Sequence, residues 1–265
     1  MLEFPLTGPV SLVVKVPAGS IEVVAEERDS ATVDIEPAGF GAQSREMAEQ
    51  TKVDMSGDTL SVIAPRANGG LLRRGGAIRV RIAVPGHSSA RIDTAAADVT
   101  CRGTYASLVI DGASSEVEVE HVTGAARIKT ASGDVQLTRV DGDLVINCAS
   151  GDARIRRVAG AVRAEFASGD LAVEEAGGDL HARTASGDIE VGTVSRGAVR
   201  LATASGDVGV GIRAGTGVWL DLNTTSGTVN NRLAMADSPT GTGDGGQLRL
   251  EVRTVSGDIE IRRAP

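Results

Sequence analysis

Between residues 124 and 191, apolar and polar residues alternate in short runs that restart every nine positions. Two and four residues after each restart stands an apolar or small residue, and this period of two is typical of β-strands. A helix would place apolar residues three and four positions apart, and each interior glycine would cost it about 1 kcal/mol. The pattern therefore predicts short strands. Each run opens with a glycine, at Gly124, Gly133, Gly142, Gly151, Gly160, Gly169, Gly178 and Gly187.

Nine is an odd number, so a turn must reset the inward and outward alternation between one run and the next. Glycine permits that reset because it reaches positive φ at low cost. Alternate runs differ, since one class reads Ser-Gly-Asp and the other Gly-Ala or Gly-Asp, and the true unit is therefore 18 residues with two strands. The Ser-Gly-Asp class occupies 132–134, 150–152, 168–170 and 186–188.

Two short strands and two turns per unit predict an all-β fold, a single-chain parallel β-solenoid in which like positions of successive coils stack about 4.8 Å apart. Left-handed hexapeptide β-helices also use 18 residues per coil. Their repeat subdivides by six, but six residues after Val135 and Leu137 stand Asp141 and Asp143. That alternative therefore fails.

The repeat degenerates toward both ends of the chain. Upstream, 96–98 and 114–116 keep the 18-residue step, and downstream the motif recurs at 205–207, 226–228 and 256–258, with a loop insertion expected near 234–246. Insertions of this kind map to loops. The last coil in the sequence, 247–263, is expected to expose an edge to which another chain can add, unless its charges prevent pairing.

The first 90 residues are less regular. We expect irregular strands within 16–27, 56–65 and 77–89, and a short helix over 43–50. These elements predict a β-rich capping region over 1–90, followed by the solenoid over 91–265. The capping region is either a separate domain or continuous with the repeats. Residues 65–77 are a linker or an exposed loop in this interpretation.

The composition favours a thin core and excludes some partners. Aromatic residues make up only 2% of the chain, so the interior must be built from aliphatic residues, as between closely stacked sheets. A net charge of −8 without basic runs argues against nucleic acid and anionic membranes, and no segment reaches the length of a membrane span. The N-terminus lacks the features of a signal peptide, so a cytoplasmic location is expected. Cys101 and Cys148 are expected to be buried thiols.

With VPAGSIEV, SGDTLSVIAP, VRIAVPGHSSARIDTAAADV and the iterated Ser-Gly-Asp units in view, the chain resembles a bacterial family of β-strand-repeat proteins of unknown function, often labelled "putative adhesin". The resemblance covers nearly the whole length. It implies a parallel β-helix, usually right-handed, and no catalytic residues. Many members carry an export signal or an anchor, and neither is evident in this sequence.

Stacking would align the aspartates of the Ser-Gly-Asp turns into a column. Like charges about 5 Å apart repel, by about 1 kcal/mol in water, so something must offset them. In one interpretation each aspartate accepts a backbone N–H in its own turn and faces water. In the other, Ca²⁺ binds between coils, and otherwise no cofactor is expected. The candidate ligands are Asp134, Asp152, Asp170, Asp188 and Asp207.

Outward columns of charge suggest ion pairs between coils, such as Arg157 with Glu175 and Glu165 with Arg183. The same faces suggest an acidic-polysaccharide site, although no aromatic platform accompanies the arginines. A lyase would need an arginine or lysine base beside bound Ca²⁺, for which Arg154 with Asp152 or Asp170 is the nearest match. An inward column at 130, 148, 166, 184 and 203 is expected to be core. The candidate binding face comprises Arg127, Arg154, Arg156, Arg163, His181, Arg183 and Arg200.

No catalytic residue is predicted, because the three histidines are scattered and stand in no nucleophile, metal or phosphate-loop motif. The sequence leaves open whether the chain is an enzyme, and it favours a non-enzymatic role. The leading hypothesis is a non-enzymatic scaffold that binds a protein partner or a second copy of itself through the solenoid edges. The alternatives are an acidic-glycan binder or lyase, and a Ca²⁺-binding repeat protein.

Overall fold

The computed structural model describes residues 1–65, 76–233 and 247–264. The expected loop insertion near 234–246 and most of the expected linker over 65–77 lie outside these residues. The chain is all-β and divides into two compact units, Met1–Gln136 and Leu137–Pro265. The capping region expected over 1–90 ends inside the first unit, where the long strand β7 (Ser88–Asp111) begins, and that boundary stays a prediction.

The first unit is built around two long parallel strands, β2 and β7, which pair from Ser11↔Ser89 to Ala25↔Gly103. The other edge of β2 pairs in parallel with β5 and then with β6. Antiparallel strands extend this side, because β3 pairs with β6, β1 with β3, and β4 with β5. The strands are β1 (Leu2–Pro5), β2 (Ser11–Glu26), β3 (Ser30–Pro37), β4 (Lys52–Ser56), β5 (Thr59–Ile63), β6 (Ile78–Pro85), β7 (Ser88–Asp111), β8 (Val117–Val122) and β9 (Ala126–Ser132).

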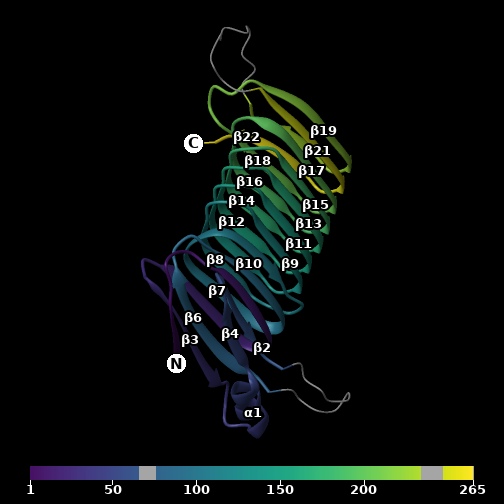
Figure 1. The fold of residues 1–265 in the computed structure, drawn as a ribbon. Coiled ribbons are helices and arrows are strands. Elements are labelled where there is room, and N and C mark those ends of the chain that lie inside the picture. Colours follow the sequence, from purple (N-terminus) through teal and green to yellow (C-terminus); the bar gives the residue numbers. More distant parts are fainter. Residues whose placement is uncertain (66–75, 234–246, 265) are drawn as a thin grey trace. The chain divides into compact units, whose positions relative to one another are not determined.

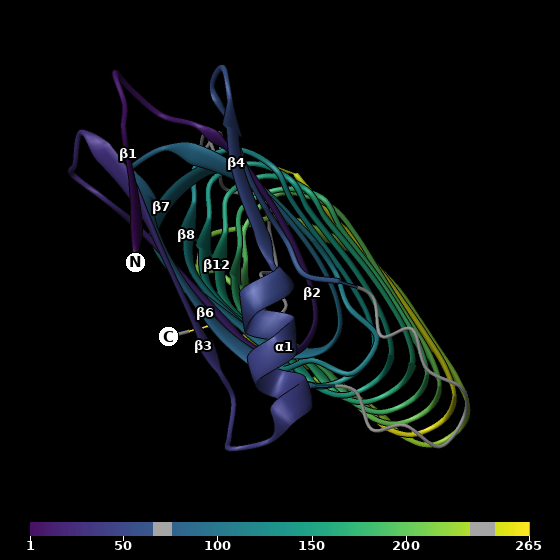
Figure 2. The same ribbon diagram turned by 60° about the horizontal axis from the view of Figure 1, so that its bottom comes forward.

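The helix expected over 43–50 is confirmed as α1 (Ala42–Gln50). It packs on β3 and β6, and Figure 2 shows it in the foreground. Ser44 ties the helix to the sheet, because its hydroxyl donates to the carbonyl of Ala38 at 3.3 Å and accepts the N–H of Ala77 at 3.1 Å. Met47 on the same helix is buried.

The second unit is a regular parallel solenoid, as the nine-residue pattern predicts (Figure 1). One sheet contains β11 (Leu144–Ser150), β13 (Val162–Ser168), β15 (Leu180–Ser186), β17 (Gly197–Ser205), β19 (Val218–Ser226) and β21 (Leu248–Ser256). The other contains β12 (Ala153–Val158), β14 (Leu171–Ala176), β16 (Ile189–Val194), β18 (Val208–Ile212), β20 (Val229–Asn231) and β22 (Ile259–Arg263). The strand β10 (Val135–Val140) spans the boundary between the units.

The predicted 18-residue register is confirmed within this unit. Leu144 lies beside Val162, which lies beside Leu180, and every pair of this kind is parallel. The core is thin and aliphatic, as the composition requires, and residues such as Ile146, Ala164 and Ala182 are fully buried. The inward column is also confirmed, because Thr130, Cys148, Phe166, Thr184 and Thr203 are all buried.

The glycines of the two turn classes serve different purposes. Those of Ser-Gly-Asp have positive φ, for example +140° at Gly187, so they reset the alternation as expected. A Cβ at Gly187 would also lie 2.1 Å from the carbonyl oxygen of Gly169 in the preceding coil. The glycines of the other class, such as Gly160, do not have positive φ. Space alone requires glycine there, because a Cβ at Gly160 would lie 2.4 Å from the oxygen of Gly142.

The order of the final coils differs from the sequence order. The strand β21 pairs with β17 on one side and β19 on the other, and β22 likewise lies between β18 and β20. Figure 1 shows β21 between its two neighbours. The expectation that residues 247–263 form the open edge is therefore wrong. Among the described strands, β19 and β20 form the outermost coil, because the coil of β21 and β22 inserts beneath them.

Candidate functional site

Strands of one sheet in the second unit place two consecutive side chains outward instead of one. In β12 these are Arg156 and Arg157, and in β14 they are Glu174 and Glu175, each pair followed by a buried residue. Each of these strands therefore exposes charged side chains at two adjacent positions. They line a groove of about 500 Å³, here called the arginine groove, whose walls are Thr138, Arg139, Arg156, Arg157, Glu174, Glu175 and Thr193.

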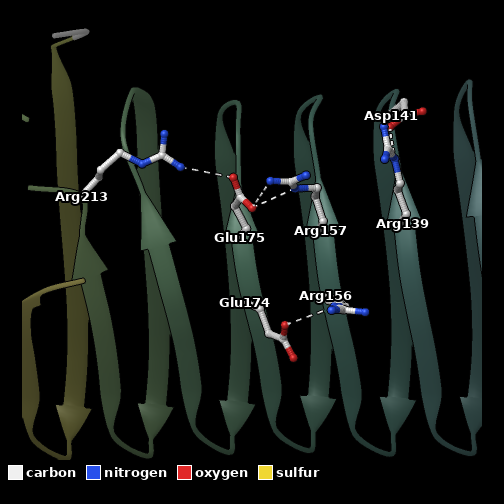
Figure 3. A network of polar contacts seen from close by, with 7 residues as sticks. All are labelled: Arg139, Asp141, Arg156, Arg157, Glu174, Glu175 and Arg213. Atoms are coloured by element: carbon white, nitrogen blue, oxygen red, sulfur yellow. Dashed lines mark hydrogen bonds and ion pairs between the residues drawn. The ribbon is translucent and has the colours of Figure 1, made fainter. Parts of the chain in front are cut away.

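Glu175 lies at the centre of this groove and binds two arginines from opposite sides (Figure 3). Its Oε2 accepts from Arg157, at 2.8 Å from Nε and 2.5 Å from Nη2. Its Oε1 accepts from Nη2 of Arg213 at 3.3 Å. The expected pairing of Arg157 with Glu175 is thereby confirmed. One carboxylate holds two guanidinium groups in fixed positions, which leaves an excess of positive charge around it.

Three further arginines complete the groove and its neighbouring hollow of about 350 Å³. Arg139 binds Asp141 on its own coil at 2.7 Å, and Arg156 lies 3.8 Å from Glu174, with both side chains about seven-tenths exposed. Arg196 donates to the carbonyl of Gly177 at 2.7 Å. Five arginines therefore face three carboxylates, a local positive excess on a chain whose net charge is −8.

The candidate binding residues from the sequence are distributed over several strands, and their role stays a prediction. Only Arg156 lines the arginine groove. Arg127 lies on β9 in the first unit, and Arg154 shares β12 with Arg156 but lies 3.6 Å from Asp152, outside the groove. The remaining four lie on the other sheet of the second unit, where Arg163, His181 and Arg200 stack in register and Arg183 stacks beside Glu165.

On that other sheet, positive charge surrounds His181. Its pKa lies below the usual 6.5, first because it is partly buried and then because Arg183, Arg163 and Arg200 disfavour a further positive charge, with Glu165 opposing them. Glu165 binds Arg163 on its own strand at 2.5 Å, and among the described residues it forms no ion pair with Arg183. The expected pairing of Glu165 with Arg183 is therefore wrong.

The aspartates of the Ser-Gly-Asp turns form a hydrogen-bonded ladder between coils. Oδ1 of Asp152 accepts the backbone N–H of Asp170 at 2.9 Å, and Oδ1 of Asp170 accepts that of Asp188 at 2.8 Å. The ladder continues from Asp188 to Asp207 at 2.7 Å. The expectation that each carboxylate binds within its own turn is therefore wrong for these oxygens, because they bind the next coil. Charge-assisted bonds of this kind offset the repulsion between stacked carboxylates.

The Ca²⁺ prediction concerns the same residues. Asp152, Asp170, Asp188 and Asp207 lie on this ladder, while Asp134 lies in the first unit. Within the described ranges, no group of three or more His, Cys, Asp or Glu side chains is arranged to hold a metal ion. The ladder accounts for the repeated aspartate without a cation, and Ca²⁺ binding stays a prediction.

Stacked threonines form a second connection between coils, on the inside of the same turns. The hydroxyl of Thr203 donates to the carbonyl of Gly187 at 3.2 Å, and that of Thr254 donates to Gly206 at 3.3 Å. Thr224 donates to Gly257 at 3.0 Å. The same turn therefore bonds the next coil through an aspartate outside and a threonine inside.

The outermost coil leaves apolar side chains without full cover. Val218, Leu220 and Leu222 of β19 are only half-buried, whereas their register partners Leu248, Leu250 and Val252 on β21 are at most 1% exposed. We call these three β19 residues the end stripe. No described strand pairs with the other edge of β19. Trp219 is 51% exposed on the opposite face, where its ring centroid lies 4.3 Å from the guanidinium carbon of Arg249.

Both cysteines are buried free thiols, as the sequence predicts. Burial raises the pKa of Cys101 to about 12. Its neighbour Tyr105 is fully buried and donates its hydroxyl to the carbonyl of Val23 at 2.8 Å, and burial also raises the pKa of this phenol. A thiol in this environment is a core residue, because the thiolate that reacts or binds metal is strongly disfavoured.

Sequence reasoning missed two features of the surface. Arg213 is not among the candidates, because the steps from β15 to β17 and from β16 to β18 are 19 residues long and remove it from the regular columns. The open end at β19 was missed although one signal was available: residues 226–228 read Ser-Gly-Thr instead of Ser-Gly-Asp. The outermost described coil can lack the aspartate without loss, because no described strand beyond it supplies a backbone N–H.

The family model for Toastrack DUF4097 matches residues 11–262, so the chain belongs to this family. This confirms the resemblance to β-strand-repeat proteins of unknown function. No curated protein matches the sequence.

Several solved structures are similar to the chain. One is a "putative adhesin" from Bacteroides fragilis NCTC 9343, with 12% identity and a TM-score of 0.48, covering 98% of this chain and 95% of the other. Another, from Parabacteroides distasonis ATCC 8503, is a "putative lipid binding protein" with 14% identity, a TM-score of 0.44 and the same coverage. A "putative adhesin" from Parabacteroides merdae ATCC 43184 has 10% identity, a TM-score of 0.44 and coverage of 98% and 94%. No helix among the described residues has the length and apolar character needed to cross a membrane.

Proposed function

We propose that this protein is a non-enzymatic interaction scaffold, and that a second copy of the chain pairs with the outer edge of β19. The observation that supports this proposal is the end stripe. Terminal repeats of a solenoid ordinarily carry a polar outer face that protects the core. In the outermost coil, Val218, Leu220 and Leu222 of β19 are only half-buried. The aliphatic residues at the same positions of β21, in the coil beneath, are fully buried.

The edge of β19 also lacks the usual protection against strand addition. Edge strands are normally blocked by lysine, proline, inward charges or bulges. Within β19 the only charged residue is Asp221, and the strand contains no lysine, arginine or proline. Among the described residues, no strand pairs with the outer edge of these nine residues, and an edge of free backbone groups is the feature that β-strand addition uses for affinity.

A second copy is a suitable occupant because it carries the same edge. Two β19 strands that pair in antiparallel orientation about a two-fold axis each supply the missing partner of the other, which is the commonest symmetry of soluble dimers. The two end stripes then form one apolar surface instead of two exposed ones. Such burial is favourable by about 25 cal/mol per Å² of apolar surface removed from water.

The experiment is multi-angle light scattering with sedimentation equilibrium across protein concentration. The unmodified chain should form a dimer, while Leu220→Lys and Leu222→Lys should remain monomeric, because lysine is charged and blocks an edge. The matched control is Ile63→Lys, which changes a 42% exposed aliphatic residue on β5 of the first unit and should leave the dimer intact. Circular dichroism checks that each variant is folded. A monomer at every concentration, or equal dimerisation of all three variants, would overturn the proposal.

A further inference from the structure

The arginine groove carries a second inference, which does not depend on the proposed function. We propose that this groove binds an acidic polysaccharide of the uronic-acid class. Its lining combines three kinds of group: guanidinium donors, carboxylate acceptors and the hydroxyls of Thr138 and Thr193.

The guanidinium groups retain donors for a ligand. Arginine carries five N–H donors in a planar fork. Arg157 uses Nε and Nη2 on Glu175, and Arg213 uses only Nη2 on the same carboxylate. Glu175 therefore fixes the positions of both groups while most of their donors stay uncommitted to it. Fixed, paired N–H donors are suited to planar carboxylates, which they bind in a bidentate manner.

The carboxylates in the groove select among anions. Glu174 is exposed and lies 3.8 Å from Arg156, a contact too long to bind it tightly. Such a carboxylate repels a ligand that is only an acceptor, but accepts hydrogen bonds from hydroxyl groups. A uronate chain provides both the acid groups that the arginines bind and the hydroxyls that the carboxylates and threonines bind. The sugar–phosphate backbone of DNA provides the negative charge without hydroxyl groups along the chain.

The lining of the groove, as described, contains no aromatic side chain, which argues against single-stranded nucleic acid as its ligand. Single-stranded nucleic acids are held by stacking of bases on aromatic residues. None of the residues described as lining the groove or its neighbouring hollow is aromatic. The groove also crosses several successive coils, from Arg139 to Thr193, so it extends along the stack far enough to take a linear polymer. A polysaccharide fits this arrangement better than a compact ligand.

The test is isothermal titration calorimetry of the intact chain with hexagalacturonate at low ionic strength. Binding is expected for the acid and should be lost for its methyl ester, which keeps the hydroxyls and removes the charges. The double variant Arg139→Ala/Arg157→Ala should weaken binding about tenfold or more, since a tenfold change corresponds to about 1.4 kcal/mol. The matched control is Arg79→Ala/Arg91→Ala, which removes two half-exposed arginines of the first unit and should bind like the unmodified chain.

Dextran sulfate, which carries sulfate esters and no uronic acid, and single-stranded poly(dT) serve as competing anions of other chemistry. Weaker binding of both than of hexagalacturonate supports the proposal. It would be overturned by an absence of hexagalacturonate binding, by equal losses in the groove and control variants, or by tighter binding of either competitor. Thermal unfolding of each variant confirms that a loss of binding is not a loss of structure.

Discussion

The backbone N–H of Asp258 donates to Oδ1 of Asp207 at 2.7 Å, although 51 residues separate them. Oδ1 of Asp258 in turn accepts the N–H of Thr228, also at 2.7 Å. The ladder therefore runs from Asp207 to Asp258 and only then to Thr228, against the order of the sequence. This relationship places the last coil of the chain beneath the coil that precedes it, and leaves β19 as the outermost strand.

The aspartate ladder predicts a specific mutational pattern at Asp188. Replacement by alanine removes the acceptor of the Asp207 N–H and should lower the free energy of unfolding by about 1 kcal/mol, the usual net value of a hydrogen bond. Replacement by asparagine keeps an Oδ1 acceptor and removes a stacked negative charge. Urea denaturation should therefore show Asp188→Asn within about 0.5 kcal/mol of the unmodified chain. Equal losses in the two variants would contradict the ladder.

The turn glycines predict a large difference between two glycine-to-alanine variants. At Gly187 the φ is +140° and the carbonyl oxygen of Gly169 lies 2.1 Å from the position that the alanine Cβ would take, which together should cost about 3 kcal/mol or more. At Gly215 the φ is +79° but no atom lies within 4 Å, so the cost should stay near 1 kcal/mol. Both values follow from thermal or urea unfolding. Similar stabilities for the two variants would show that the backbones of successive coils are further apart at this turn.

The sequence predicts the regular part of this fold but not all of its contacts. The nine-residue spacing predicts coils, register and the inward column, because all three follow from strand period and parity. The sequence does not predict the hydrogen-bond partners in the aspartate ladder. Whether Asp188 binds within its own turn or binds the next coil depends on where its Oδ1 points. The reordered coils do not follow either, because spacing gives no information once the chain leaves the repeat near 234–246.

The sequence predicts some contacts of the arginine groove and not others. The sequence predicts the pairing of Arg157 with Glu175, since both occupy the same position of successive coils. It does not predict two consecutive outward residues, because strict alternation would turn one of them inward. Nor does it bring Arg213 to the same carboxylate, since β18 departs from the register of β16 after Val191.

The lowered pKa of His181 predicts a pH dependence of stability. The unfolded chain takes up a proton at this residue near pH 6.5, while the folded chain resists it, so the unfolded state binds more protons. The contribution of His181 should therefore be neutral well above pH 6.5 and destabilising as the pH falls below it. The His181→Gln variant should lose this part of the pH dependence of unfolding. A nuclear magnetic resonance titration that gives a pKa above 6.5 would contradict the prediction.

The two thiols should be inert in the folded protein. Burial raises the pKa of Cys101 to about 12, and Cys148 is only 3% exposed. At neutral pH neither should react with Ellman's reagent until denaturant is added, when both should react. Rapid reaction of a thiol in the native chain would indicate that the core opens locally around it.

The central claim, that another copy of the chain pairs with the outer edge of β19, is tested most directly by amide hydrogen exchange at low and high protein concentration. Alternate amides of this strand point away from β21 and have no described strand beside them. We expect these amides to exchange quickly in dilute solution and to become protected as concentration rises, while amides of β13 and β15 stay protected throughout. Unchanged exchange in β19 at both concentrations would contradict the claim.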